Sequence, residues 1–151
     1  MNESGSDRTD PSVALRIVLR AGIAMALLLV LVLTLHPAIS PGPGRSIQLI
    51  PLYFLSSLAE ETGIVRWFVW RNIIGNFLLF MPFAGLVACA SGWRSAVLWT
   101  AVVVLLIEAS QFVFFERVAD IDDVILAVAG ASCAAAIVTL GSKLFRRLGP
   151  P

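Results

Sequence analysis

The sequence contains few of the residues on which covalent and metal-dependent catalysis usually depend. Only one histidine and two cysteines occur among the 151 residues, and their spacing is not that of a metal or redox site. No Ser–His or Cys–His pair is available for covalent catalysis. Because Cys89 and Cys133 lie inside apolar runs, we expect both to be small buried residues.

Charged residues are also scarce. Asp, Glu, Lys and Arg make up 14% of the chain, whereas soluble domains contain about 25%. The net charge of +1 gives no reason to expect a nucleic-acid partner. The hydrophobic content of 58% is arranged in long, unbroken runs. These features exclude an ordinary soluble domain and indicate a protein of the cell membrane, with the lipid bilayer as its main partner.

Four apolar stretches have the length of about 20 residues that a transmembrane helix needs. They predict an all-α integral membrane protein with four spans, at about residues 11–35, 71–90, 94–115 and 120–144. Asp10 and Asp120 are placed to cap the first and fourth helices, and Pro82 should kink the second. We expect one membrane domain over residues 10–148, preceded by a disordered polar leader at residues 1–9.

Two segments allow more than one interpretation. Residues 52–62 are apolar but too short to cross a bilayer, so they could be interfacial or re-entrant. Arginines followed by the apolar residues 21–35 could form a signal peptide. We interpret this stretch as a membrane anchor instead, because the helical pattern begins at Pro11 and "HPAIS" is a poor cleavage site.

Lys and Arg residues near the span ends predict the orientation of the chain. Seven lie on one side of the predicted spans: Arg8, Arg16, Arg20, Arg94, Lys143, Arg146 and Arg147. Four lie on the other side: Arg45, Arg66, Arg71 and Arg117. Since the richer side is normally cytoplasmic, we predict that both termini are cytoplasmic and that the acidic turn before the fourth span faces outward.

Polar side chains inside the predicted spans are the unusual feature of this sequence. Asn72 and Asn76 are four residues apart and Glu108 and Gln111 are three apart, so each pair lies on one helix face. Glu108 lies about 10 Å of helix inside Phe115. A carboxylate at such a depth costs about 3 kcal/mol, so we expect Glu108 to face the protein interior or a wet cavity. The two asparagines could instead only join helices.

An acidic turn follows the third span. Arg117 is followed by Asp120, Asp122 and Asp123 at the predicted start of the fourth helix. The three aspartates could simply complement the helix dipole, or they could hold a divalent cation through oxygen ligands. Arg117 and Arg71 are candidate contacts for a phosphate group, although Arg71 could also snorkel outward or neutralise the acids.

The outer ends of the second, third and fourth spans should lie at one level in the membrane. We therefore predict that Glu108, Gln111, Asn72 and Asn76 meet in a polar pocket in the outer leaflet, roofed by the acidic turn. The fourth span carries small residues at this level, which permit close helix packing: Ala127, Gly130, Ala131 and Ala134.

Three segments resemble the signature segments of the VanZ-like family. They are "NIIGNFLLFMPFAG" at residues 72–85, "IEASQ" at residues 107–111 and "RVADIDDVILAVAG" at residues 117–130. In addition, "LIPL" at residues 49–52 is similar to the short segment that usually follows the first span of that family. The resemblance covers about residues 45–140. It is specific because all three segments occur in the right order, each with its polar residues.

The resemblance implies that the family's polar positions fall on eight residues: Asn72, Asn76, Glu108, Gln111, Arg117, Asp120, Asp122 and Asp123. This chain departs from the family at residue 127, where Ala replaces the usual Asn. It also has Gln48 and Leu52 in a segment that commonly reads Asn-Leu-Ile-Pro-Phe. The family is named for an accessory protein of glycopeptide resistance that lowers susceptibility to teicoplanin.

Three functions are compatible with these residues. In the first, the protein binds or modifies a lipid-linked envelope component at the outer leaflet, with Glu108 as a candidate general acid or base and a divalent cation bridging a phosphate. In the second, it is a non-catalytic membrane scaffold that binds a partner or the lipid tail of a lipoglycopeptide. In the third, it is a small proton-linked carrier built on Glu108. The sequence leaves open whether the protein is an enzyme.

Overall fold

The structure is a computed structural model that describes residues 11–35, 46–115 and 117–149. The elements follow the order α1 (Pro11–Leu35), β1 (Ser46–Gln48), α2 (Tyr53–Glu60), α3 (Gly63–Leu79), α4 (Met81–Ser91), α5 (Trp93–Phe114), β2 (Val118–Asp120) and α6 (Ile121–Leu148). The predicted leader, the Asp10 cap and the loop after α1 lie outside the described residues.

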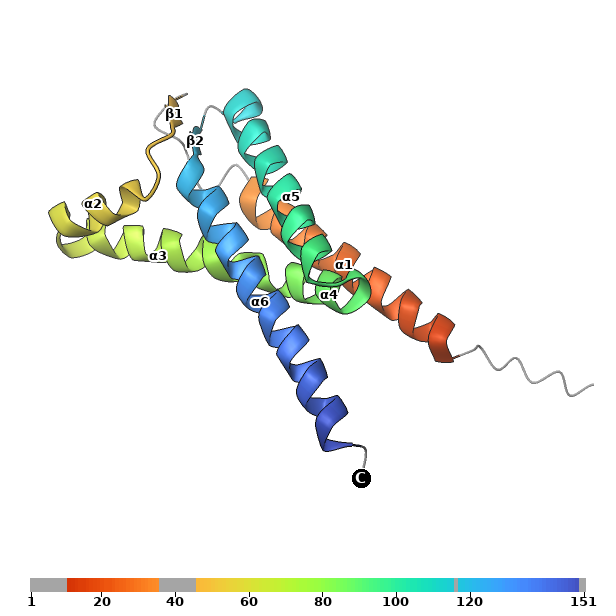
Figure 1. Ribbon diagram of the computed structural model, residues 1–151. Helices are drawn as coiled ribbons and strands as arrows, with labels where there is room; N and C mark the ends of the chain where they lie inside the picture. The colour runs from red at the N-terminus through yellow and green to blue at the C-terminus, as the bar shows by residue number, and fades with distance from the viewer. Residues whose placement is uncertain (1–10, 36–45, 116, 150–151) are drawn as a thin grey trace, which may run out of the picture.

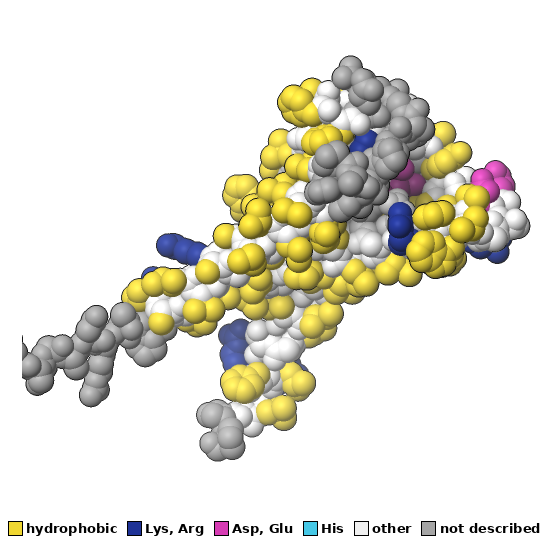
Figure 2. Space-filling model, turned by 180° about the vertical axis from the view of Figure 1, so that it is seen from behind, with side chains coloured by type: hydrophobic (Ala, Val, Ile, Leu, Met, Phe, Trp, Pro, Cys, Tyr) yellow, Lys and Arg dark blue, Asp and Glu magenta, His cyan; other side chains and the backbone are white. Residues whose placement is uncertain are grey.

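Four helical stretches are long and apolar enough to cross a bilayer, as predicted. They are α1, the α3–α4 pair, α5 and α6. The first residues of α1 and the last residues of α6 point toward one end of the molecule, whereas α5 ends and α6 begins at the other end (Figure 1). We call this second end, where the chain turns through β2, the α5–α6 end. Apolar side chains cover most of the surface (Figure 2).

The second span differs from the prediction in its start and its continuity. Helix α3 begins at Gly63, whereas we predicted a start at residue 71. Trp67 and Trp70, which precede the predicted start, are therefore part of the helix. The helix is interrupted at Phe80, and Pro82 lies in the first turn of α4. Proline lacks the N–H group of a helix interior but fits the first turn well, so the expected kink is a break between two helices.

A short two-stranded sheet was not predicted. Strand β1 pairs in parallel with β2, with Ser46 opposite Val118 and Gln48 opposite Asp120. Each strand has three residues, which is too few to produce the alternating pattern by which a strand is identified in a sequence. The sheet holds the segment before α2 against the turn between α5 and α6.

Helix α2 accounts for most of the segment whose position we left open. It has eight residues, none of them buried, and it packs against α3. At 1.5 Å per residue it is about 12 Å long, so it cannot cross a bilayer. In Figure 1 it lies beside the first turns of α3, away from α1.

The cysteines correct one of our expectations. Cys89 and Cys133 are both exposed on the protein surface, whereas we expected buried positions. In a soluble protein an apolar context indicates burial, but in a membrane protein the lipid-facing surface is apolar as well. The sequence around these residues therefore could not distinguish the core from the lipid-facing surface.

Helix α6 packs closely against its neighbours through small residues. Ala127, Gly130, Ala131 and Ala134 are all buried, as the expected close packing requires. At Gly130 the approach is closest, because a Cβ atom added there would overlap the carbonyl oxygen of Phe77 on α3. Glycine is therefore needed at residue 130 to bring α3 and α6 together.

We predict that Gly130→Ala destabilises the protein by about 1–3 kcal/mol, because the added methyl group forces α3 away from α6. The measurement is the midpoint of thermal unfolding in detergent. Gly141→Ala is the matched control, since this residue lies on the same helix and a Cβ atom there meets no atom within 4 Å. If both variants unfolded at the same temperature, the close approach at Gly130 would not contribute to stability.

Candidate functional site

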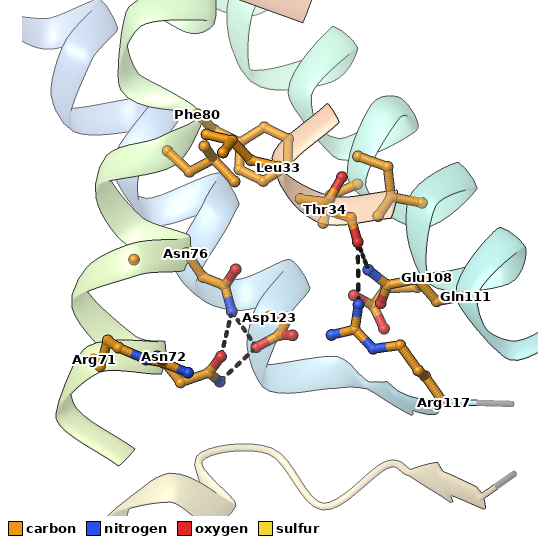
Figure 3. Close-up of a pocket in the computed structure, with 14 residues that line it drawn as sticks. Leu33, Thr34, Arg71, Asn72, Asn76, Phe80, Glu108, Gln111, Arg117 and Asp123 are labelled. Carbon is orange, nitrogen blue, oxygen red and sulfur yellow. Dashed lines mark hydrogen bonds between the residues drawn. The ribbon is translucent and has the colours of Figure 1, made fainter. Parts of the chain in front are cut away.

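A partly polar cavity of about 340 Å³ lies near the α5–α6 end. Figure 3 shows its lining side chains projecting from α1, α3, α5, α6 and the turn before β2. The lining consists of Leu33, Thr34, Arg71, Asn72, Gly75, Asn76, Leu79, Phe80, Val104, Ile107, Glu108, Gln111, Arg117 and Asp123. The cavity brings together Glu108, Gln111, Asn72 and Asn76, the four residues from which we predicted a pocket.

Asp123 connects α6 to α3 across this cavity. Its Oδ1 atom accepts hydrogen bonds from the Nδ2 groups of both Asn72, at 3.1 Å, and Asn76. The Nδ2 group of Asn76 also lies 3.4 Å from Oδ1 of Asn72. The two asparagines are on one face of α3 and act together, so they supply the donors that a carboxylate at this position needs.

Glu108 is buried on α5, with 7% of its surface exposed. Its Oε2 atom accepts a hydrogen bond of 2.9 Å from the backbone N–H group of Asp120. Among the described residues this is the hydrogen bond that holds the carboxylate, and it leaves Oε1 without a partner. The side chain faces the protein interior, as the cost of placing a carboxylate in lipid requires.

Asp120 and Asp122 hold backbone amides. Asp120 is the N-cap of α6, as predicted, and accepts a hydrogen bond of 2.9 Å from the N–H group of Asp122. Burial raises the pKa of the Asp120 carboxyl group, and the charge of Asp122 adds to the rise, while the hydrogen bond to the Asp122 N–H opposes it. The buried carboxylate of Asp122 accepts from the N–H groups of Leu52, at 2.6 Å, and Phe54, at 3.0 Å.

Asp122 therefore anchors the start of α2. Leu52 precedes this helix with a φ of 61°, in the left-handed region that non-glycine residues rarely adopt. The first N–H groups of a helix lack partners within it, and Asp122 supplies an acceptor from another part of the chain. Asp120, Asp122 and Asp123 lie together at the start of α6, but nothing in the sequence indicates that Asp122 serves a different helix.

Gln111 and Arg117 hold the end of α1. The Nε2 group of Gln111 and the Nη1 group of Arg117 donate to the same backbone oxygen, that of Thr34, at 2.9 and 3.1 Å. Carbonyl groups in the last turn of a helix lack partners within it. Thr34 was not among the predicted site residues, because a backbone acceptor leaves no mark in the sequence.

Arg71 lines the cavity from α3. Its guanidinium group lies over the rings of Trp67, at 5.7 Å, and Phe68, at 5.0 Å, which is within the range of a cation–π contact. In the described part of the chain, no carboxylate oxygen lies within 4 Å of the guanidinium groups of Arg71 or Arg117. Both predicted phosphate contacts thus line one cavity, where Arg117 also interacts electrostatically with Glu108 and Asp123.

The three aspartates are not arranged as a cation site. Asp120 caps its own helix, Asp122 holds the start of α2, and Asp123 faces the asparagines of α3. Within residues 11–35, 46–115 and 117–149, no group of three or more His, Cys, Asp or Glu side chains is placed to hold a metal ion. The three carboxylates therefore hold different parts of the protein and do not converge on one point in the described part of the chain.

Ala127, the main departure from the family pattern, lies directly beside the cavity. It is completely buried in an apolar cluster with Val30, Phe80, Val104 and Ile107. Three of these neighbours also line the cavity. Alanine at residue 127 therefore keeps this wall apolar, where the more common asparagine would add a polar group.

We predict that Asp122→Ala releases α2 from the α5–α6 end. The N–H groups of Leu52 and Phe54 lose an ionised acceptor, and each such bond contributes about 1.5–3 kcal/mol. Hydrogen–deuterium exchange should become faster at residues 52–60 while α5 stays protected. Glu60→Gln is the control, because it removes an exposed carboxylate from the same helix. Unchanged exchange in Asp122→Ala would contradict the anchoring role.

Comparison with known proteins identifies the family of this chain. Neither the curated proteins nor the solved structures contain a significant match to this chain. The sequence does match the VanZ/LLP1 family over residues 23–144. This range includes the cavity, the acidic turn and all the long helices except the first turns of α1 and the last turn of α6. The chain therefore belongs to the VanZ/LLP1 family of membrane proteins.

Proposed function

We propose that this protein binds or modifies a lipid-linked component of the cell envelope at the outer leaflet, and that it thereby lowers susceptibility to glycopeptide antibiotics such as teicoplanin. The observation that carries the proposal is the pair of guanidinium groups of Arg71 and Arg117 in one cavity with Glu108. Arginine suits phosphate because its planar group donates two parallel hydrogen bonds. A phosphate-bearing head group is therefore the ligand chemistry that fits this cavity best.

Glu108 is the candidate catalytic residue. One of its oxygens accepts from the Asp120 N–H group, which fixes the orientation of the carboxyl group. Glu108 also lines the cavity, which places its carboxyl group beside a bound ligand. A carboxyl group held in this way can give a proton to, or take one from, a bound head group. The proposal assigns no covalent intermediate to the protein.

A non-catalytic scaffold is the second candidate, and a specific observation favours it. The polar side chains around the cavity connect separate elements: Asp122 holds α2, Asp123 holds α3, and Gln111 holds α1. Such bonds would be needed even if the cavity only bound a partner. The two candidates differ in whether the proton of Glu108 matters.

We predict that Glu108→Gln leaves the protein folded but removes its effect on teicoplanin susceptibility. Glutamine keeps an oxygen that can accept from the Asp120 N–H group, but it cannot exchange a proton. The measurement compares the growth of strains carrying the wild-type gene, the variant or a deletion, at equal protein level, in teicoplanin and in a glycopeptide without a lipid tail. The variant should behave like the deletion strain. Full function in Glu108→Gln would favour the scaffold instead.

The proposal also requires that the α5–α6 end face outward. We predict that alkaline phosphatase fused after Gly149 is inactive, whereas the same enzyme fused within the turn between α5 and α6 is active. The reason is the excess of Lys and Arg at the ends of α1 and α6 remote from that turn. The reverse pattern of activity would place the cavity on the cytoplasmic side and contradict the outer-leaflet proposal.

A further inference from the structure

The cavity changes from polar to apolar along the direction of the helices. On α3 its lining runs from Arg71 and Asn72 to Leu79 and Phe80, a distance of about 12 Å at 1.5 Å per residue. Figure 3 shows the same separation, with Phe80 and Leu33 at one end of the cavity and Arg71 and Arg117 at the other. A ligand that matched this lining would need a polar part and an apolar part.

Helix α5 repeats this order. Gln111 and Glu108 line the polar part of the cavity, and Ile107 and Val104 follow toward the middle of the helix. In Figure 3, Phe80 and Leu33 lie at the end of the cavity away from Arg71 and Arg117. With the α5–α6 end at the bilayer surface, as the proposed function requires, the apolar part of the cavity lies deeper in the bilayer.

The polar part of the cavity offers positive groups to an anion. Arg71 and Arg117 bring two positive charges, and Arg117 also interacts electrostatically with Glu108 and Asp123. The two carboxylates in the lining, Glu108 and Asp123, each accept hydrogen bonds from the protein. The amides of Asn72 and Gln111 provide further polar groups in the lining.

The side of the cavity between α1 and α3 is loosely packed. Helix α1 packs against α4 and α5, whereas α3 packs against α6 and α2. In the described part of the chain, α1 and α3 therefore share little or no packing, although Leu33 and Thr34 on one helix and Gly75 on the other line the same cavity. Gly75 is exposed, and a Cβ atom added there would meet no atom within 4 Å.

We infer that the ligand is a membrane-embedded amphiphile with a phosphate-bearing head group, and that it enters the cavity sideways from the bilayer, past Gly75, between α1 and α3. The head group of the ligand lies against Arg71 and Arg117. The first carbons of its hydrocarbon chain lie along Leu33, Leu79 and Phe80. This inference rests on the proposed function, which assigns an anionic head group to the cavity. It adds the route of entrance and excludes water-soluble phosphates as the preferred ligands.

A bulky side chain at Gly75 should close this route. Gly75→Phe places a ring in the space between α1 and α3 without displacing a protein atom at its Cβ position. Gly85→Phe is the matched control, because Gly85 lies on α4, is absent from the cavity lining and also has no atom within 4 Å of an added Cβ. Gly75→Ala should keep the route open.

The experiment measures thermal unfolding of the full chain in detergent, with three probes: phosphatidic acid, phosphatidylcholine and glycerol 3-phosphate. A ligand that binds only the folded protein raises the midpoint. We expect phosphatidic acid to raise the midpoint of the wild type, Gly75→Ala and Gly85→Phe more than either other probe does. Gly75→Phe should lose this rise.

The inference has a second test if Gly75→Phe fails to fold. Gly75→Cys, in a chain that also carries Cys89→Ala and Cys133→Ala, can be modified with N-ethylmaleimide after purification. The bulky group is then attached at residue 75 of a protein that has already folded. Modification should abolish the rise with phosphatidic acid, and the unmodified protein should retain it.

Three outcomes would overturn the inference. Equal rises with phosphatidic acid and phosphatidylcholine would indicate a general lipid effect. A rise with phosphatidic acid that persists in Gly75→Phe would exclude entrance past this residue. Equal rises with glycerol 3-phosphate and phosphatidic acid would mean that the protein does not recognise the acyl chains of the lipid. The anion site of the proposed function would still stand. The proposed function itself fails separately, if Glu108→Gln and the deletion do not alter teicoplanin susceptibility.

Discussion

A carboxylate in an apolar environment needs hydrogen-bond donors, and this requirement shapes the α5–α6 end of the protein. Four carboxylates of the described residues lie there, and each accepts from a different donor. Asp120 accepts from its own helix, Asp122 from the backbone before α2, Asp123 from two asparagines of α3, and Glu108 from the turn itself. Because the donors belong to separate elements, satisfying the acids also assembles the site.

The long helices and the polar pocket were predictable, for related physical reasons. A membrane span needs a long apolar run, which any reading of the sequence detects. The high cost of a buried carboxylate made Glu108 conspicuous within such a run, and it implied that neighbouring polar groups would meet it. The cavity lining includes Glu108, Gln111, Asn72, Asn76, Arg117 and Asp123, whereas Asp120 and Asp122 are not part of it.

Other features could not be predicted, because they depend on contacts distant in the sequence or on backbone atoms. The sheet of β1 and β2 consists of two three-residue strands, and the role of Asp122 depends on the N–H groups of Leu52 and Phe54. The role of Thr34 likewise depends on its carbonyl oxygen. The exposure of the two cysteines could not be predicted for a different reason, because lipid-facing and buried residues of a membrane protein are equally apolar.

The anchoring of α2 by Asp122 has a consequence for the biogenesis of the protein. The N–H groups of Leu52 and Phe54 precede their acceptor by 70 and 68 residues, and α3, α4 and α5 are all synthesised in between. During translation, the ribosome must therefore complete three further helices before the start of α2 meets its partner. Insertion of the last span is the event that completes the polar end, so a nascent chain stalled before residue 122 carries α2 and α3 without the acceptors that Asp122 and Asp123 supply.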